Sequence, residues 1–288
     1  MTTAVILVNY NGSNDTIACI NSLNQCLNAG DIKTIVVDNS KSEKEKKKLE
    51  EFQASINDSF DLIFLNENRG FSHANNAGIK YALEKYHIDF LMLLNNDTLV
   101  EPDFLVKLIT QFDASSLMVT PKVLFNSKRE LVWSAGGHID FKKGIGANNG
   151  FMKDSSLYSE VSYCDYSPFC SVMFKPDLIK KYGYLDENYF MYFEDVDYCM
   201  RLLENGKSIK YVPDSVVYHK VSASSGGLRS NFYLEWMTRN QKKFIKKFFG
   251  KNKMVYLRFL LKVLAKKTFY FLKFNFAAIK CINKGLRH

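Results

Sequence analysis

The chain has 288 residues, of which 47% are apolar and 24% charged, a composition typical of a globular protein and not of a disordered one. Its length suits one domain with an appendage, and its 5 prolines exclude a collagen-like or linker-rich protein. Six scattered cysteines form no C-x-x-C pair, which argues against a zinc ribbon or a disulfide framework and favours the reducing cytoplasm. No basic residue precedes Asn11 and no 18 consecutive residues are apolar, so we expect neither a signal peptide nor a spanning helix.

The net charge of +9 is unevenly distributed along the chain. Residues 239–288 hold 15 of the 39 basic residues and none of the 30 acidic ones, so the remainder of the chain is slightly acidic. This asymmetry predicts a C-terminal segment with a task of its own at an anionic surface.

The first 120 residues alternate between short apolar runs and amphipathic segments. The apolar runs predict strands buried on both faces, over residues 4–8, 34–37, 62–65, 90–94 and 117–120. Between them we expect helices over residues 15–26, 41–52 and 75–85, and a fourth that begins at Pro102. Strand–helix alternation of this kind predicts an α/β fold with a mostly parallel central sheet flanked by helices.

The pattern loosens after residue 126. Glycine and asparagine clusters predict hairpins and a mobile loop over residues 126–163, and we expect a strand within 163–174. Residues 189–205 are expected to form a helix, or a turn followed by a helix, and short strands are expected over 209–212 and 216–218.

Polar residues follow each of the first four predicted strands. Ligands of parallel sheets bind beyond the carboxyl ends of the strands, so we expect a site where these residues meet. They are Asn9-Tyr10-Asn11, Asp38-Asn39-Ser40, residues 66–70 and Asn95-Asn96-Asp97.

Asp97 and His219 are candidates for a metal site. A carboxylate at the end of a buried strand is costly without a positive partner, and a divalent cation with a diphosphate is one such partner. Capping of the following turn is the alternative for Asp97. His219 follows the apolar run 216–218 and could reach the same cleft, where an imidazole can bind Mn²⁺ or Mg²⁺; a purely structural histidine is the alternative.

Glu194 and Asp195 lie in an aromatic segment with a third carboxylate, Asp197. Apolar surroundings and neighbouring negative charge raise the pKa of a carboxyl group, which suits a general base near neutral pH. We expect Asp195 at the N-terminus of a helix, and we assign Asp197 to an i,i+4 ion pair with Arg201.

A fourth candidate segment covers residues 66–78. Arg69 is a bidentate donor for phosphate and Gly70 permits close approach of the backbone. Asn75 and Asn76 are expected at a helix start, where backbone N–H groups favour anions; a plain loop with an asparagine cap is the alternative. No dinucleotide fingerprint, Walker loop or hydrolase elbow occurs anywhere in the sequence.

In this order, the motifs resemble those of the family 2 glycosyltransferases of GT-A fold, over residues 1 to about 225. Each motif is weak alone, whereas the ordered set is specific. The set comprises Val8-Asn9-Tyr10-Asn11, Val37-Asp38-Asn39-Ser40, Asn66-x-x-x-Gly70-Phe71-x-x-Ala74-Asn75-Asn76, Asn95-Asn96-Asp97, Glu194-Asp195 and His219. The chain is most similar to bacterial rhamnosyltransferase-like members, which build surface polysaccharides.

The resemblance implies a role for each position. Asp195, beside Glu194, would be the general base, and Asp97 with His219 would bind Mn²⁺ or Mg²⁺ at the diphosphate. The motif reads Asn-Asn-Asp in place of Asp-x-Asp, so the metal would depend on His219 and the diphosphate itself. Asp38 would accept from a pyrimidine N–H. The other residues that would bind the nucleotide-sugar are Val8, Asn9, Tyr10, Asn11, Asn39, Arg69, Gly70, Asn75, Asn95 and Asn96.

The implied reaction is an inverting transfer of a sugar, with rhamnose a candidate, from a UDP- or dTDP-sugar to a hydroxyl of a glycan or polyprenyl-linked acceptor. Residues 134–138 and 168–173 are expected to shape the acceptor or sugar pocket. A sugar-phosphate nucleotidyltransferase is one alternative, although residues 9–14 lack the expected Lys or Arg. A membrane-associated nucleotide-sugar-binding module without turnover is another, which the Asn-Asn-Asp motif leaves open.

We expect a catalytic domain over residues 1–228 and a basic amphipathic helical tail over 229–288. As one helix, residues 251–284 would carry a cationic stripe on an apolar surface, which is typical of a helix lying on an anionic membrane. This would place the chain in the cytoplasm, peripherally on the inner face of the plasma membrane. A helix packed on the catalytic domain and a homo-oligomer interface are the alternatives; nucleic acid is not an expected partner. The stripe consists of Lys251, Arg258, Lys262, Lys266, Lys273, Lys280 and Lys284.

Overall fold

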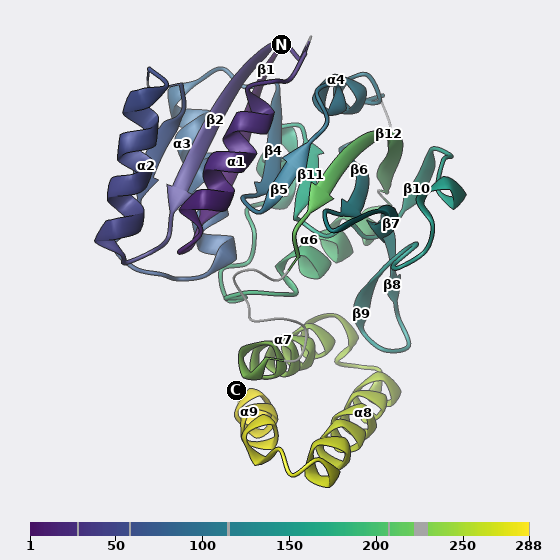
Figure 1. Ribbon diagram of the computed structural model, residues 1–288. Helices are drawn as coiled ribbons and strands as arrows, with labels where there is room; N and C mark the ends of the chain where they lie inside the picture. The colour runs from purple at the N-terminus through teal and green to yellow at the C-terminus, as the bar shows by residue number, and fades with distance from the viewer. Residues whose placement is uncertain (28, 58, 114–115, 207, 222–229, 288) are drawn as a thin grey trace.

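The computed structural model describes residues 1–27, 29–57, 59–113, 116–206, 208–221 and 230–287. Within these residues, a ten-stranded sheet has helices on both faces, and three further helices lie beneath it (Figure 1). The sheet contains β1 (Thr2–Asn9), β2 (Asp31–Asp38), β3 (Asp61–Phe64), β4 (Phe90–Asn95), β5 (Thr98–Val100), β6 (Met118–Phe125), β7 (Lys128–Ser134), β10 (Ser162–Cys164), β11 (Ser171–Phe174) and β12 (Ile209–His219). A separate hairpin consists of β8 (Gly137–Asp140) and β9 (Ile145–Asn148).

The helices around the sheet follow the predicted alternation. They are α1 (Ser13–Leu23), α2 (Glu43–Ser55), α3 (Phe71–Lys85), α4 (Phe104–Ile109), the short 3₁₀ helix η1 (Ser155–Leu157), α5 (Asp177–Tyr182) and α6 (Glu194–Leu203). Side chains alternate across each buried strand, so β1 supplies Val5 and Leu7 to the core under α1, α2 and α4. Ala4 and Ile6 enter the opposite core, under α3, α5 and α6.

The sheet has a parallel half and a mixed half. Strands β3, β2, β1 and β4 are neighbours and parallel throughout, which confirms the expected parallel arrangement. Strand β11 is antiparallel to both β4 and β6, while β12 runs parallel to β6. The short strands β5, β7 and β10 are antiparallel to their partners. The fold is therefore α/β with a mixed, mostly parallel central sheet.

Several boundaries differ from the expected ones, most clearly those of α3 and β12. Helix α3 begins at Phe71 and not near Asn75, because Gly70 with φ 96° ends the preceding loop there. The two short strands expected over 209–218 form one strand, β12, with an irregularity between Val212 and Val216.

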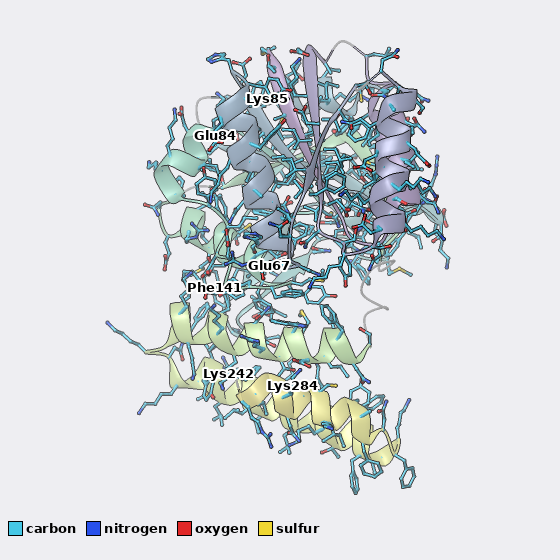
Figure 2. All side chains as sticks on the ribbon, turned by 90° about the vertical axis from the view of Figure 1, so that its left-hand side faces the viewer. Glu67, Glu84, Lys85, Phe141, Lys242 and Lys284 are labelled. Carbon is cyan, nitrogen blue, oxygen red and sulfur yellow. The ribbon has the colours of Figure 1, made fainter. Side chains whose placement is uncertain are left out.

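The C-terminal region forms three helices, α7 (Asn231–Phe249), α8 (Lys253–Leu272) and α9 (Phe276–Arg287). The expectation of one helix over 251–284 is wrong, because the chain turns at residues 273–275, where Phe274 has φ 52°. Helices α8 and α9 lie on the side of α7 that faces away from the sheet (Figures 1 and 2). The expected domain boundary between residues 228 and 229 lies outside the described residues.

The three helices share a small core of their own. Val255, Phe259 and Val263 of α8 pack there with side chains from α7 and α9. The expected cationic stripe is not continuous: Lys262 is partly covered, and burial together with the nearby Lys143 lowers its pKa. None of the described helices is long and apolar enough to cross a bilayer.

Candidate active site

Strand pairing brings Asp97 and His219 together. Asp97 lies in the turn between β4 and β5, and β5 pairs with β12 so that Thr98 is opposite His219. Consequently Nε2 of His219 lies 3.1 Å from Oδ1 of Asp97 and 3.4 Å from Nδ2 of Asn95. Both the Asp97 and the His219 side chains are buried. Asp97 therefore faces a partner and is not merely a turn cap.

Two neighbours of this pair were missed by the sequence reasoning. The backbone N–H of Lys220 donates to the carbonyl of Asp97 at 3.0 Å, and its ammonium pairs with Asp15. Trp133 of β7 lies edge-on to the His219 ring with 4.8 Å between ring centroids. Burial pushes the pKa of Asp97 up, but His219, with a smaller effect from Lys220, holds it below its usual value. Asp97 is therefore ionised and surrounded by potential cations.

The residues around Asp97 fit a divalent cation. One carboxylate and one imidazole are ligand types that Mn²⁺ and Mg²⁺ accept. Adjacent ligands of an octahedral ion at about 2.1 Å are about 3 Å apart, close to the observed distance between Asp97 and His219. The described residues contain no cluster of three His, Cys, Asp or Glu side chains suited to a metal. The remaining positions around an ion would thus belong to water or to a diphosphate.

Glu194 and Asp195 occupy the first turn of α6, as expected. The Tyr166 hydroxyl donates to Oδ2 of Asp195 at 2.8 Å, and the N–H of Val196 donates to Oδ1 at 2.7 Å. Burial raises the pKa of Asp195, although the hydrogen bond from Tyr166 opposes the rise. The pKa of Glu194 is raised well above its usual value by burial and by Asp195, and its Oε2 has no partner in the described part of the chain. Burial thus raises the pKa of both neighbouring carboxyl groups, and hydrogen bonds from Tyr166 and Val196 oppose the rise at Asp195.

The segment before α6 is strained. Tyr192 and Phe193 both have positive φ, 70° and 74°, which costs about 1–2 kcal/mol for each non-glycine residue.

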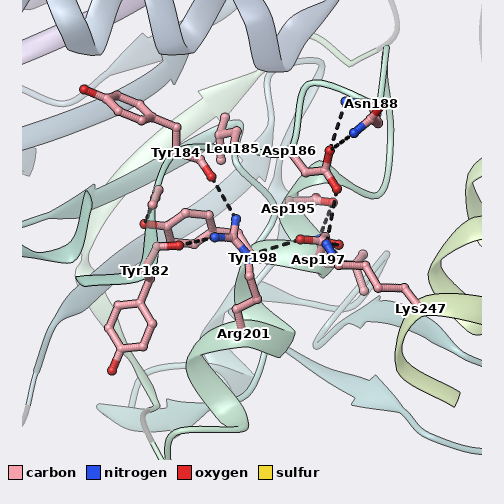
Figure 3. Close-up of polar contacts among 12 residues, drawn as sticks. Tyr182, Tyr184, Leu185, Asp186, Asn188, Asp195, Asp197, Tyr198, Arg201 and Lys247 are labelled. Atoms are coloured by element: carbon pink, nitrogen blue, oxygen red, sulfur yellow. Dashed lines mark hydrogen bonds and ion pairs between the residues drawn. The ribbon is translucent and has the colours of Figure 1, made fainter. Parts of the chain in front are cut away.

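The expected ion pair between Asp197 and Arg201 is present at 3.2 Å. Lys247 of α7 approaches the other oxygen of Asp197 at 2.6 Å, which the sequence did not indicate (Figure 3).

The charges of both Asp97 and Asp195 act on the buried thiol of Cys170. The carbonyl of Cys170 accepts from the N–H of Asn95 at 2.8 Å. Burial, then the charges of Asp97 and Asp195, raise the pKa of the Cys170 thiol well above its usual value, so this buried thiol lies near both carboxylates. Figure 1 shows the carboxyl ends of β4 and β12 close to α6 at the lower edge of the sheet.

The side chains of Asn9 and Asn96 turn inward. Asn9 donates to Oδ1 of Asp38 at 2.8 Å and accepts from the Thr16 hydroxyl at 2.9 Å. Asn96 also donates to the Thr16 hydroxyl, at 2.9 Å. These buried side chains connect the ends of β1, β2 and β4, so they fix the loops at this edge of the sheet. The nucleotide-binding role expected of Asn9 and Asn96 stays a prediction.

Other residues of the nucleotide set differ in their exposure. Val8 is half-buried, Tyr10 is exposed, and Asn11 follows with φ 53°. Asp38 itself is buried, and its Oδ2 has no hydrogen-bond partner among the described residues. Asn39 donates to Asn68 at 2.8 Å, while its buried Oδ1 has no partner in the same described set.

Arg69 and Gly70 lie where the loop after β3 meets the segment before α6. The Arg69 side chain is exposed, and its Nη2 lies 3.7 Å from Oε2 of Glu187. A Cβ on Gly70 would lie 2.1 Å from the Phe190 carbonyl oxygen, so the close approach made here is to the chain's own backbone. The N–H of Phe71 donates to the same carbonyl at 2.8 Å.

Asn75 and Asn76 are not at a helix start. Both lie in the second turn of α3, where Asn75 donates to the Phe71 carbonyl at 3.0 Å. Asn76 donates to the Leu185 carbonyl and to Glu187, each at 3.0 Å. The expected anion site at Asn75 and Asn76 is therefore wrong, because the helix begins four residues earlier than predicted.

Comparison with known proteins agrees with this architecture. Rhamnosyltransferase WbbL of Escherichia coli is 30% identical over 57% of this chain and 64% of its own length. The hexosyltransferase Agl10 of Haloferax volcanii, of low-salt glycan biosynthesis, is 23% identical over 69% of this chain and 60% of its own. The chain thus spans less than two thirds of the length of these two relatives.

Solved structures share the fold at low sequence identity. The mannosyltransferase PcManGT of Pyrobaculum calidifontis, in complex with GDP-Man and Mn²⁺, matches 85% of this chain and 64% of its own, with a TM-score of 0.61 and 14% identity. GalNAc-T7 with UDP, GalNAc and Mn²⁺ matches 85% of this chain and 50% of its own, with a TM-score of 0.63 and 16% identity.

A family model decides the assignment. The model described as glycosyl transferase family 2 matches residues 4–180, which is more than half of the chain and contains β1 to β5 with all the polar strand ends. The chain therefore belongs to glycosyl transferase family 2.

Proposed function

We propose that this chain transfers a sugar from a UDP- or dTDP-sugar to an acceptor hydroxyl with inversion at the anomeric carbon. The observation that carries the proposal is the pairing of Asp97 with His219 at 3.1 Å, together with a half-buried Asp195 whose pKa is raised. One site thus contains candidate groups for a diphosphate and for a hydroxyl proton.

Asp195 would act on the acceptor. Its carboxylate takes the proton of the attacking hydroxyl as that oxygen forms the new glycosidic bond and the bond to the nucleoside diphosphate breaks. Tyr166 holds this carboxylate through the 2.8 Å hydrogen bond. A single protein base suffices, because the diphosphate leaves with the electron pair of the broken bond.

Asp97 and His219 would hold a divalent cation against the diphosphate. A bound Mn²⁺ or Mg²⁺ supplies charge stabilisation to the departing diphosphate. Lys220 adds a protein cation beside Asp97, and Arg69 is an accessible cation at the loop after β3.

The finer identity of the substrates is part of this proposal. Asp38 Oδ2 is available to accept from the N–H of a pyrimidine base, which suits uridine and thymidine equally. Relatives named as rhamnosyltransferases support rhamnose as the transferred sugar. A glycan or polyprenyl-linked acceptor of surface polysaccharide synthesis would supply the hydroxyl.

Two measurements test the proposal. Calorimetric titration with UDP and dTDP, with and without Mn²⁺, should show metal-dependent nucleotide binding, and a donor screen against membrane extracts should show turnover.

Asp195→Asn should lower kcat by about 10²–10⁴-fold, the usual contribution of a positioned base. Asp154→Asn, which removes an acid that only caps η1, is the matched control. Wild-type turnover in Asp195→Asn rejects the base, and nucleotide binding without turnover favours a binding module.

We propose in addition that α8 and α9 bind an anionic membrane surface. The described residues between 254 and 276 include ten large apolar side chains that are exposed. They lie within residues 239–288, which include 15 basic residues and no acidic one. Burial of apolar side chains in the lipid and attraction of basic ones to anionic headgroups would therefore act together. The exposed side chains are Met254, Leu257, Leu260, Leu261, Leu264, Phe269, Phe271, Leu272, Phe274 and Phe276.

Vesicle flotation tests the membrane proposal. The full chain should float with vesicles that contain phosphatidylserine or phosphatidylglycerol, less with phosphatidylcholine alone, and less at high salt. Replacing Leu261 and Leu264 by Glu should abolish flotation, whereas Leu157→Glu, at an even more exposed leucine of the catalytic region, should not. Unchanged flotation of the double variant contradicts the proposal. A concentration-dependent dimer that the same variant loses assigns this surface to a second copy of the chain.

A further inference from the structure

Helix α7 contacts the segment before α6 through one face. Residues spaced by four, three and four positions lie on one side of an α-helix. This spacing is followed by Trp236, Asn240, Lys243 and Lys247. Trp236 stacks on Phe190 at 4.8 Å between ring centroids, and the Lys243 ammonium lies 4.8 Å from the Tyr189 ring centroid.

Asn240 makes the central contact of this face. Its side-chain amide donates to the carbonyls of Met191 at 2.8 Å and Tyr192 at 2.9 Å. The side chain is fully buried, and its Oδ1 has no hydrogen-bond partner in the part of the chain that the structure describes. Burying an amide with an unpaired oxygen costs free energy. The two hydrogen bonds that the Asn240 amide nitrogen donates are therefore the favourable interactions at this position.

The Met191 carbonyl precedes the strained turn into α6, and the Tyr192 carbonyl belongs to this turn. Tyr192 and Phe193 have positive φ, a conformation that non-glycine residues keep only when their surroundings hold it. Helix α6 starts at the next residue, so this turn sets the direction in which Glu194 and Asp195 enter the site.

Lys247 of α7 contacts the same region through two carboxylates. Its ammonium lies 2.6 Å from Asp197 and 3.2 Å from Asp186 (Figure 3). Asp197 belongs to the first turn of α6 and is fully buried. Helix α7 therefore fixes both the residues before Asp195 and the helical turn that contains it.

We propose that Asn240 is a positioning residue for Asp195: by holding the Met191 and Tyr192 carbonyls, it keeps the turn at Tyr192 and Phe193 and thereby the placement of the base. This inference rests on the proposed role of Asp195. It also makes α7 a part of the active-site framework, although α7 belongs to the segment that the sequence assigns to the tail.

Asn240→Asp tests the inference because it keeps the size of the side chain and removes the N–H donors. We expect kcat to fall by about tenfold to 10²-fold, since a displacement of about 1 Å at a reacting group has an effect of that order. The donor KM and the calorimetric stoichiometry for nucleotide should stay within about twofold of wild type, because the Asp97 site does not contact Asn240.

Gln241→Glu is the matched control. Gln241 is the next residue of α7, is also buried, and donates to the Lys143 carbonyl at 2.9 Å, outside the segment before α6. The same chemical change there should leave kcat near wild type. Asn240→Ala removes the donors without adding a carboxyl group and should reproduce the fall in kcat if Asn240→Asp does not fold.

The outcomes separate this inference from the proposed function. A fall in kcat confined to the Asn240 variants, with nucleotide binding intact, supports the inference. Wild-type kcat in Asn240→Asp, or an equal fall in Gln241→Glu, overturns it. An inactive Asp195→Asn enzyme with fully active Asn240 variants rejects the positioning role alone, whereas an active Asp195→Asn enzyme rejects the base assignment on which the role depends.

Discussion

The hydroxyl of Tyr166 donates a hydrogen bond of 2.8 Å to Oδ2 of Asp195, and this bond favours the ionised carboxylate. Tyr166→Phe should therefore raise the pKa of Asp195. A hydrogen bond to a charged group is worth about 1.5–3 kcal/mol, which corresponds to a shift of about one to two pH units. Because Asp195 acts in its deprotonated form, the acidic limb of the kcat/KM profile should move to higher pH and activity should be lost first at low pH.

Tyr211→Phe is the control for this prediction. Tyr211 is also buried, and its hydroxyl donates to the Tyr158 carbonyl at 2.9 Å, away from the acids of α6. Its pH profile should match that of the wild type. If the acidic limbs of the two variants coincide, Tyr166 does not tune the base.

Removing either member of the Asp97–His219 pair should weaken the metal response. Asp97→Asn and His219→Ala should each raise the Mn²⁺ concentration for half-maximal activity by at least about tenfold, since even loss of a group that supports a ligand has such an effect. Chelation should abolish turnover by the wild type, and Mn²⁺ should restore it. An unchanged Mn²⁺ requirement in both variants would exclude this pair as the metal site.

Lys220 should contribute to donor binding through its charge. Lys220→Met should raise the donor KM several-fold, corresponding to about 1 kcal/mol for a partly exposed cation. Lys33→Met, which removes a surface lysine paired with Asp31, is the matched control and should leave KM unchanged. Equal KM values for the two variants, measured at low salt, would show that Lys220 does not face the donor.

Gly70 should be far less replaceable than Gly206. Both have positive φ, but a Cβ at Gly70 would lie 2.1 Å from the Phe190 carbonyl oxygen, whereas nothing described lies within 4 Å of one at Gly206. Gly206→Ala should lower the free energy of unfolding by about 1–2 kcal/mol, the conformational cost alone. Gly70→Ala should lower it by more, and should reduce kcat because the segment before α6 must shift. Urea titrations that rank the two glycines in the opposite order would contradict the close contact.

The motifs in the first half of the chain are local, which is why they could be interpreted from the sequence. Apolar runs that end in polar residues indicated β1 to β4, and these runs placed Asp38 and Asp97 at one sheet edge. The aromatic and acidic composition around Glu194 and Asp195 correctly indicated a helix start. Such features depend on the periodicity of neighbouring residues, which the sequence displays directly.

Other features depend on contacts between distant segments. The inward turn of Asn9 and Asn96 requires Thr16, and the early start of α3 requires the Phe190 carbonyl beside Gly70. A polar residue at a strand end does not reveal whether it faces a ligand or a neighbouring loop. Asn240 likewise has no local signature beyond its place in a helical spacing.

Trp236, Asn240 and Lys247 reach their partners beside α6 from one face of α7, so their spacing along the helix matters as much as their identity. Inserting one residue between Trp236 and Asn240 would rotate everything after it by about 100° relative to Trp236. Asn240 and Lys247 would then leave their partners even though no side chain had been replaced. The proposed placement of Asp195 therefore depends on the helical phase of α7, and not only on which side chains the helix carries.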